Sequence, residues 1–191
     1  AFGPIVTANS YTVEYWNKAG TTKLSSDTGF KYDTARNLAA KPSSGVSTGY
    51  SAVGWSTSTN QSTASYGFGS SQKNLATSGT KKLYLAETAN RYTVSFNVNG
   101  GSGGQSSNVT ATYAANMPGI STTKPTRAGY TFGGWYDTSS SSGGTQYYNA
   151  NCGSARTWNK ASNATLYARW TPNSYTVEYW NKAGTTKLSS D

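Results

Sequence analysis

The stretch SYTVEYWNKAGTTKLSSD, residues 10–27, alternates apolar and polar side chains along its first half. Tyr11, Val13 and Tyr15 lie on one face of an extended strand, because side chains alternate between the two faces of a sheet. The same eighteen residues occur again, without a substitution, at 174–191. The pattern therefore predicts a half-buried β-hairpin at both places.

Weaker repeats connect these two copies. Tyr-Thr-Val begins at residues 11, 92 and 175, and the pattern Gly-Tyr followed by Gly-Trp recurs at 49–55 and 129–135. An A–B pair of repeats would then recur every 164 residues, the distance from Tyr11 to Tyr175. We expect the sequence to be a window on a longer tandem array. Its predicted parts are a tail of a preceding repeat or a linker (1–9), repeat A (10–90), repeat B (91–173) and the first hairpin of the next A-type repeat (174–191).

Each repeat is predicted to be rich in β-strands. Residues 92–98 alternate between apolar and polar side chains, and Asn99-Gly100-Gly101 follows with the residue types that a tight turn requires. One short helix is predicted between Ala111 and Ile120, ended near Met117-Pro118. The expected fold class is therefore β-rich α+β. The residues predicted to be largely buried are Tyr11, Val13, Tyr15, Tyr50, Trp55 and Leu83 in A, and Tyr92, Val94, Phe96, Tyr130, Phe132, Trp135 and Leu166 in B.

The chain lacks the groups that catalysis and metal binding commonly use. It has no histidine, a single cysteine and seven carboxylates, and repeat B contains one carboxylate, Asp137. Paired carboxylates of the glycosidase type are therefore not available within B. Asp137 is expected to form a turn rather than to bind calcium. We expect no catalytic, cofactor-binding or metal-binding residues, no cofactor and no enzymatic activity.

The net charge of +9 comes from scattered Lys and Arg residues. Lys81-Lys82 is the one adjacent basic pair, and no basic stripe follows a predicted strand. This pattern favours a solvated basic surface, so no nucleic-acid partner is expected. No apolar run is long enough to cross a bilayer, so membrane insertion is not expected either.

Aromatic side chains are abundant for so polar a chain, with six Trp and fifteen Tyr. Most of the tryptophans are predicted to fill the cores. Trp16 differs because it is in phase with Thr12 and Glu14, so its side chain is predicted to point away from the core. An outward Trp serves either as a contact with a partner or as a platform for sugar stacking. We expect an interface between repeats or subunits at Trp16, Tyr175, Val177, Tyr179 and Trp180.

Repeat B contains five blocks in a recognisable order: YTVSFNVNGG, ATYAANMP, KPTRAGYTFGGWYDT, GGTQYY and TLYARW. Together they resemble the Listeria–Bacteroides repeat family. Repeat A is similar through YTVEYW, GYSAVGW and KKLYLAE, but has no clear counterpart of GGTQYY. The resemblance implies a compact β-grasp-like domain, a sheet with one short helix, that occurs in tandem on secreted or surface-anchored bacterial proteins. It carries over no catalytic residues.

Two functions of different classes follow. The first is an extracellular structural repeat of a bacterial stalk, adhesin or fibre, whose partners are neighbouring repeats or subunits of the same protein. The alternative is an adhesive module that binds glycan or a host surface protein through exposed Trp and Tyr. Two explanations of residues 174–191 also stay open, namely a truncated repeat and a strand donated to a neighbouring molecule.

Overall fold

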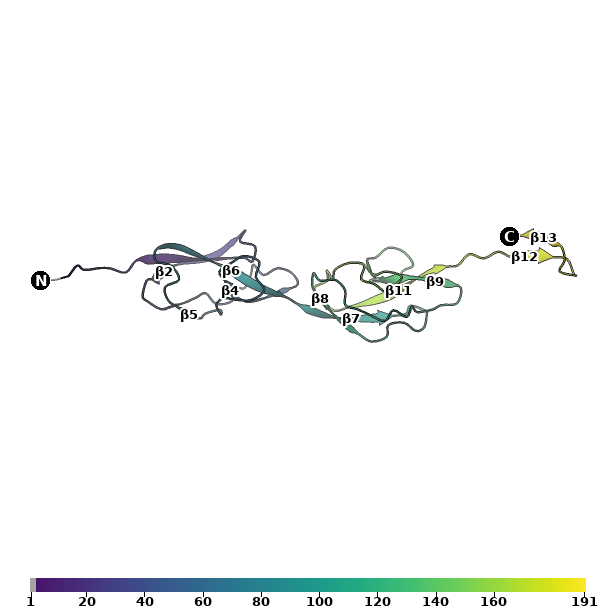
Figure 1. Cartoon of the computed structure of the whole chain (residues 1–191), viewed down its shortest axis with the longest axis horizontal. Helices are drawn as coiled ribbons and strands as arrows, with labels where there is room; N and C mark the ends of the chain where they lie inside the picture. Colours follow the sequence, from purple (N-terminus) through teal and green to yellow (C-terminus); the bar gives the residue numbers. More distant parts are fainter. Residues whose placement is uncertain (1–2) are drawn as a thin grey trace. The chain divides into compact units, whose positions relative to one another are not determined.

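The computed structural model describes residues 3–191 and contains two compact units (Figure 1). The first unit extends to Arg91, and the second begins at Tyr92. Two short segments from later in the chain, Thr112–Ala114 and Asn159–Ala161, also belong to the first unit. Both units are built from strands joined by turns and irregular segments, and residues 3–191 contain no helix.

The first unit is built on a four-stranded sheet with the order β2-β1-β6-β4. β1 is parallel to β6, and the other neighbours are antiparallel. A parallel pair needs a long connection, and here the chain between β1 and β6 contains β2, β4, irregular segments and the short β3–β5 pair. The strands are β1 (Ser10–Trp16), β2 (Lys23–Lys31), β3 (Arg36–Asn37), β4 (Tyr50–Ser56), β5 (Ser71–Gln72) and β6 (Gly79–Ala89).

The second unit has a five-stranded sheet with the order β10-β9-β11-β7-β8. β7 and β11 form the parallel pair, in the same relation as β1 and β6. The strands are β7 (Arg91–Asn97), β8 (Val109–Thr112), β9 (Tyr130–Tyr136), β10 (Gln146–Tyr148) and β11 (Ala164–Pro172). The two sheets therefore share one plan, as the repeats in the sequence predict.

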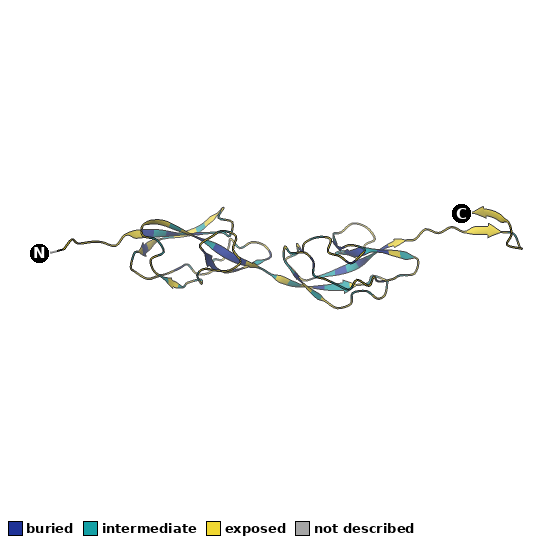
Figure 2. Cartoon of the chain, in the orientation of Figure 1, coloured by how far each residue is buried: buried dark blue, intermediate teal, exposed yellow. Residues whose placement is uncertain are grey.

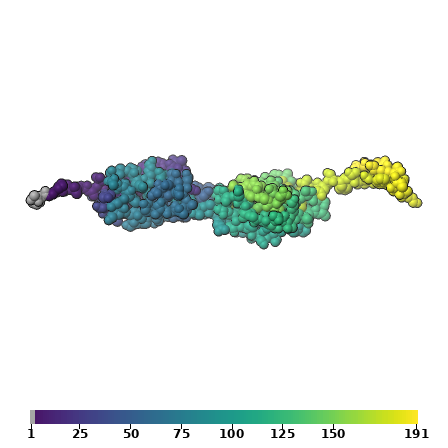
Figure 3. Space-filling view, in the orientation of Figure 1, coloured from purple at the N-terminus to yellow at the C-terminus, as the bar shows by residue number. Residues whose placement is uncertain are grey.

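The last two strands, β12 (Glu178–Trp180) and β13 (Lys187–Ser190), form a two-stranded sheet of their own. Every residue in both strands is exposed, and both are drawn in yellow in Figure 2. They lie in the yellow end of the chain in Figure 3.

The helix predicted between Ala111 and Ile120 is wrong. Ala114 has a left-handed backbone conformation, with φ of 62°, which interrupts any helix there. Beyond it, the Trp158 N–H donates to the Ala115 carbonyl at 2.9 Å and the Met117 N–H donates to the Ser154 hydroxyl at 2.9 Å. This segment is thus held in extended pairing with residues far along the chain. The fold is all-β rather than α+β, and the β-grasp-like description stays a prediction.

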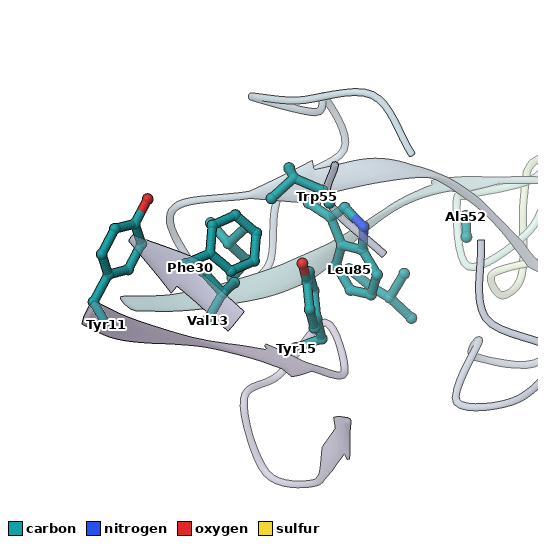
Figure 4. Packing of buried hydrophobic residues seen from close by; sticks show 9 residues of the cluster. Tyr11, Val13, Tyr15, Phe30, Ala52, Trp55 and Leu85 are labelled. Atoms are coloured by element: carbon teal, nitrogen blue, oxygen red, sulfur yellow. The ribbon is translucent and has the colours of Figure 1, made fainter. Parts of the chain in front are cut away.

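The core of the first unit is aromatic and lies on one face of the sheet (Figure 4). The rings of Tyr15 and Trp55 pack at a tilt with centroids 4.6 Å apart, and the ring centroids of Tyr11 and Phe30 are 5.5 Å apart. The predicted alternation of β1 is confirmed, because Tyr11, Val13 and Tyr15 are all buried. The buried members of this cluster are Tyr11, Val13, Tyr15, Phe30, Leu38, Ala52, Trp55, Leu83 and Leu85.

The core of the second unit contains Trp135 and Trp158, both fully buried. Phe96 packs edge-on against Trp135 with centroids 5.1 Å apart, and Tyr147 lies 5.0 Å from Trp158. The predicted core positions that are confirmed as buried are Tyr11, Val13, Tyr15, Trp55, Leu83, Val94, Phe132, Trp135 and Leu166.

Four predicted core residues are half-buried instead: Tyr50, Tyr92, Phe96 and Tyr130. The two tyrosines of the Gly-Tyr motifs begin strands, and each carries a cation over its ring. Lys18 Nζ lies 4.3 Å from the Tyr50 centroid, and the Arg127 guanidinium carbon lies 3.8 Å from that of Tyr130. A ring that holds a solvated cation lies at the surface, because full burial would remove the charge from water.

Candidate functional site

The face of β1 that points into the first unit shows what the repeated hairpin requires. Tyr11, Val13 and Tyr15 are 2%, 0% and 1% exposed. Every other buried member of their cluster comes from residues 28–90, outside the stretch that is copied. The second edge of β1 pairs with β6, which also lies in that range. The hairpin is therefore completed by residues 28–90 of its own unit.

Trp16 points away from this core, as its phase with Glu14 predicts. Its ring lies 4.9 Å from Lys82 Nζ, and its indole N–H donates to Glu14 Oε1 at 3.3 Å. The side chain is half-buried by these neighbours on the outer face of the sheet. A cation over an indole stabilises by about 0.5–1 kcal/mol at an exposed site. The structure thus gives Trp16 contacts within its own unit, and its role at an interface stays a prediction.

The second copy of the hairpin reproduces the turn of the first. Asn181 Oδ1 accepts the backbone N–H groups of Thr185 and Thr186 at 2.9 and 3.2 Å. In the first copy Asn17 Oδ1 accepts the corresponding two N–H groups at 2.8 and 3.1 Å. An Asn side chain that bonds to nearby backbone fixes a turn locally. The turn therefore forms from the eighteen residues alone, without help from the rest of the unit.

Burial is the property that the second copy does not reproduce. Tyr175, Val177 and Tyr179 are 84%, 40% and 50% exposed, although they are the same residues in the same order as the buried face of β1. Trp180 is also exposed, and its indole N–H donates to Glu178 Oε2 at 3.1 Å. The structure thus places four of the five predicted interface residues together on one exposed hairpin, whereas the fifth, Trp16, belongs to the first unit.

This hairpin has two unsatisfied features. Its apolar side chains face solvent, and each of its strands has one partner within residues 3–191. Burying a side chain such as Val177 stabilises by about 1.5–3 kcal/mol, and an unpaired strand edge is a template for a further strand. An isolated two-stranded hairpin is marginally stable in water. The arrangement can therefore accept a parallel strand and an apolar layer of the kind that β6 and Trp55 supply in the first unit.

Other chemistry is sparse. No group of three or more Cys, Asp or Glu side chains that could hold a metal ion is present within residues 3–191. Asp137 Oδ1 accepts the Thr145 N–H at 2.7 Å and so closes the loop between them, as expected of a turn former. Across the same residues, no helix is long and apolar enough to cross a membrane.

One pair of structural contacts was missed in the sequence. Asn90 and Asn173, which follow the last strand of each sheet, fasten the chain back onto the Gly-Tyr motif. The Asn90 N–H donates to the Gly49 carbonyl at 2.8 Å, and the Asn173 N–H donates to the Gly129 carbonyl at 2.9 Å. Each Asn side chain also accepts a hydroxyl, from Ser51 and Thr131. The signal was available, since each asparagine lies seven residues after the Leu of the recurring Leu-Tyr.

A family model, the Listeria-Bacteroides repeat domain, matches the chain twice, at residues 7–84 and 92–169. The matched segments correspond to the two sheets, and each contains the parallel central pair.

Proposed function

The chain belongs to the Listeria-Bacteroides repeat family, and from this premise we propose that it is a non-enzymatic structural repeat of a bacterial stalk, adhesin or fibre outside the cell. Members of this family typically occur in extracellular or surface-associated proteins, which supports the proposed location. The proposed partners are neighbouring repeats of the same protein. The chain has no histidine, and repeat B contains a single carboxylate, Asp137, so the sequence supplies no motif that would favour an enzyme instead.

The observation that carries this proposal is the difference in burial between two identical hairpins. Val13 is fully buried within β1, whereas Val177, the same position of the second copy, is 40% exposed just before β12. The buried residues of the cluster that lie outside the copied stretch all come from 28–90, so a further copy of that range would supply the same contacts to the second hairpin. An array of A–B pairs satisfies every A-type hairpin by supplying that complement from the same chain.

The plan of the units supports the same proposal. Each places its first and last long strands side by side and parallel at the centre of the sheet. A pull on the two ends of such a unit loads all the hydrogen bonds of the central pair together. We propose that each unit is a helix-free form of the β-grasp-like domain, in which irregular chain replaces the crossover helix.

Completion of the third unit tests the proposal. The chain is extended after Asp191 with a second copy of residues 28–90, and hydrogen exchange is measured on β12. We expect its amides to become as protected as those of β1, because a β6 equivalent now pairs with them. The control extension carries Leu83→Asp and Leu85→Asp in the added copy. Equal exchange of β12 in the extended and original chains would contradict the proposal.

A binding function is the second candidate. It is favoured by one observation, a cavity beside Arg127, Tyr130 and Trp170 of the second unit. That cavity is distinct from the hairpin and is not needed for an array.

A further inference from the structure

A cavity of about 480 Å³ opens on the second unit beside Trp170. This volume falls within the range of roughly 300–1,000 Å³ that small-molecule sites occupy. Four segments supply its walls: the turn after β7, the segment that enters β9, the loop after β9, and the end of β11. The side chains that matter are Asn99, Arg127, Tyr130, Ser139, Ser141 and Trp170.

Arg127 is the charged group of this cavity. Its guanidinium stacks on Tyr130, with the central carbon 3.8 Å from the ring centroid. Gly100 makes room for it, because a Cβ there would lie 3.3 Å from the guanidinium carbon. Stacking fixes the plane of the guanidinium but leaves its in-plane N–H donors available. Arg127 makes no ion pair with the residues that the structure describes, and no carboxylate lines the cavity.

The neighbouring groups supply hydrogen bonds rather than further charge. Asn99 Nδ2 donates to the carbonyls of Ser139 and Ala168 at 3.0 and 3.1 Å, so its Oδ1 is left as an acceptor. Ser139 and Ser141 are exposed and add hydroxyls that both donate and accept. The Trp170 indole N–H is already bonded to the Val98 carbonyl at 3.0 Å. The cavity therefore combines one planar cation with acceptors and hydroxyls.

We propose that this cavity binds a carboxylated saccharide of the uronic-acid type, with the sugar carboxylate on Arg127 and its hydroxyls on Asn99, Ser139 and Ser141. A carboxylate matches the planar fork of a guanidinium with two parallel hydrogen bonds. Ring hydroxyls match the acceptor of Asn99 and the two serines. An acidic peptide would satisfy Arg127 but has no hydroxyls for the other three side chains.

The first unit shows that the site is a property of repeat B. Aligned on the Gly-Tyr and Leu-Tyr motifs, Arg127 corresponds to Ser47 and Trp170 corresponds to Glu87. Glu87 is 1% exposed, and its Oε1 accepts the Ser47 N–H at 3.1 Å. The first unit thus has Ser47 and a buried glutamate where the second has the Arg127 guanidinium and the Trp170 wall, so it lacks the cation at the position that the proposed ligand requires.

The test is calorimetric titration of the full chain with trigalacturonate, with its methyl ester and with triglutamate. We expect saturable binding of trigalacturonate with Kd on the order of 1 mM or tighter, weakened by salt. The methyl ester and triglutamate should each bind about 10-fold more weakly or worse, because each lacks one half of the proposed contacts.

Variants locate the binding. Arg127→Gln should weaken trigalacturonate binding by about 10-fold to 100-fold, and Arg127→Lys should weaken it less, because the charge stays but the fork is lost. Arg156→Gln is the matched control. It removes the same charge from an arginine that also lies over a tyrosine, with its guanidinium carbon 5.4 Å from the Tyr147 centroid, but outside the cavity. The Kd of the Arg156→Gln variant for trigalacturonate should stay within twofold of that of the unmodified chain.

Several outcomes would overturn the proposal: no saturable binding, triglutamate binding as tight as trigalacturonate, or equal losses in Arg127→Gln and Arg156→Gln. The methyl-ester comparison needs no variant, so it decides the matter even if Arg127→Gln unfolds the unit. The extension of the chain with residues 28–90 does not involve Arg127, so the structural proposal and this one fail separately.

Discussion

The ring of Tyr15 lies 4.6 Å from the indole of Trp55, and the two side chains together hold the backbone of Ala39. The Ala39 N–H donates to Tyr15 Oη at 3.0 Å, and the Trp55 indole N–H donates to the Ala39 carbonyl at 2.9 Å. Ala39 belongs to the irregular crossover between β3 and β4. A pair of core aromatics on the sheet thus fixes a connection that has no secondary structure of its own.

Tyr15→Phe tests this contact. The change leaves the Ala39 N–H without its acceptor, so the free energy of unfolding of the first unit should fall by about 1–3 kcal/mol. The measurement is urea denaturation in which hydrogen exchange monitors the unfolding of each unit separately. Tyr179→Phe is the control, because Tyr179 holds the same place in the exposed copy and should change stability by less than about 0.5 kcal/mol. Equal effects of the two substitutions would show that the bond to Ala39 contributes nothing.

Gly101→Ala tests the turn that lies under Trp170. A Cβ at Gly101 would lie 2.3 Å from Trp170 Cζ2 and 2.8 Å from the Thr126 carbonyl oxygen, so atoms of the core would have to move. Overpacking of this kind costs about 1–3 kcal/mol, and the melting temperature of the second unit should fall. Gly119→Ala is the control, since a Cβ there meets nothing within 4 Å. If both variants melt at the same temperature, the packing at Gly101 is looser than the structure shows.

Tyr148 gives the second unit a stability that is lost in alkali. Its hydroxyl donates to the Pro118 carbonyl at 2.6 Å, and burial raises the pKa of Tyr148 well above its usual value. The unfolded chain releases this proton near pH 10, whereas the folded unit retains it. Above about pH 10 the unfolded state therefore binds fewer protons, and the free energy of unfolding falls as the pH rises.

Tyr148→Phe should remove part of this slope. Denaturant unfolding of the second unit at pH 8 to 12 should show a smaller loss of stability per pH unit in the variant. Tyr175→Phe, on the exposed hairpin outside both sheets, is the control for the loss of a tyrosine hydroxyl. A slope that is equally steep in Tyr148→Phe would assign the alkaline loss to other groups.

Local alternation predicted the strands well because each sheet buries one face. Val13, Val94 and Leu166 are buried where a period of two places them. The helix was predicted wrongly because the apolar stretch after Ala111 gave no sign of its pairing with Ser154 and Trp158, which lie far along the chain. Long-range pairing of this kind leaves no mark in the local pattern.

The two candidate sites differ in the same way. The exposed hairpin could be predicted, since exact repetition identifies which residues a buried face must contain. The cavity at Arg127 could not be predicted, because in the sequence Arg127 is one of several scattered basic residues. The place of Arg127 in a cavity depends on the fold, which brings Trp170 and Asn99 to the same cavity.

Deletion of residues 174–191 decides whether the hairpin is donated to a second molecule. Inserted into the first unit of another copy, it would make the same contacts as residues 10–27, since the sequences are identical. The resident hairpin would then be released with its own Tyr11, Val13 and Tyr15 exposed. The apolar surface buried is unchanged by the exchange, while association costs an estimated 4–15 kcal/mol at 1 M standard state. Donation therefore has no net driving force in this chain.

We accordingly expect sedimentation to give the same oligomeric state with and without residues 174–191, over a range of protein concentrations. The free energy of unfolding of each unit should also change by less than about 0.5 kcal/mol on deletion, because neither large sheet includes β12 or β13. Val177→Asp is the matching point variant, since it removes the apolar face without shortening the chain. Oligomers that disappear in both the deletion and Val177→Asp would establish donation or pairing of hairpins between molecules. In that case the exposed face would have to gain contacts that the first unit does not offer.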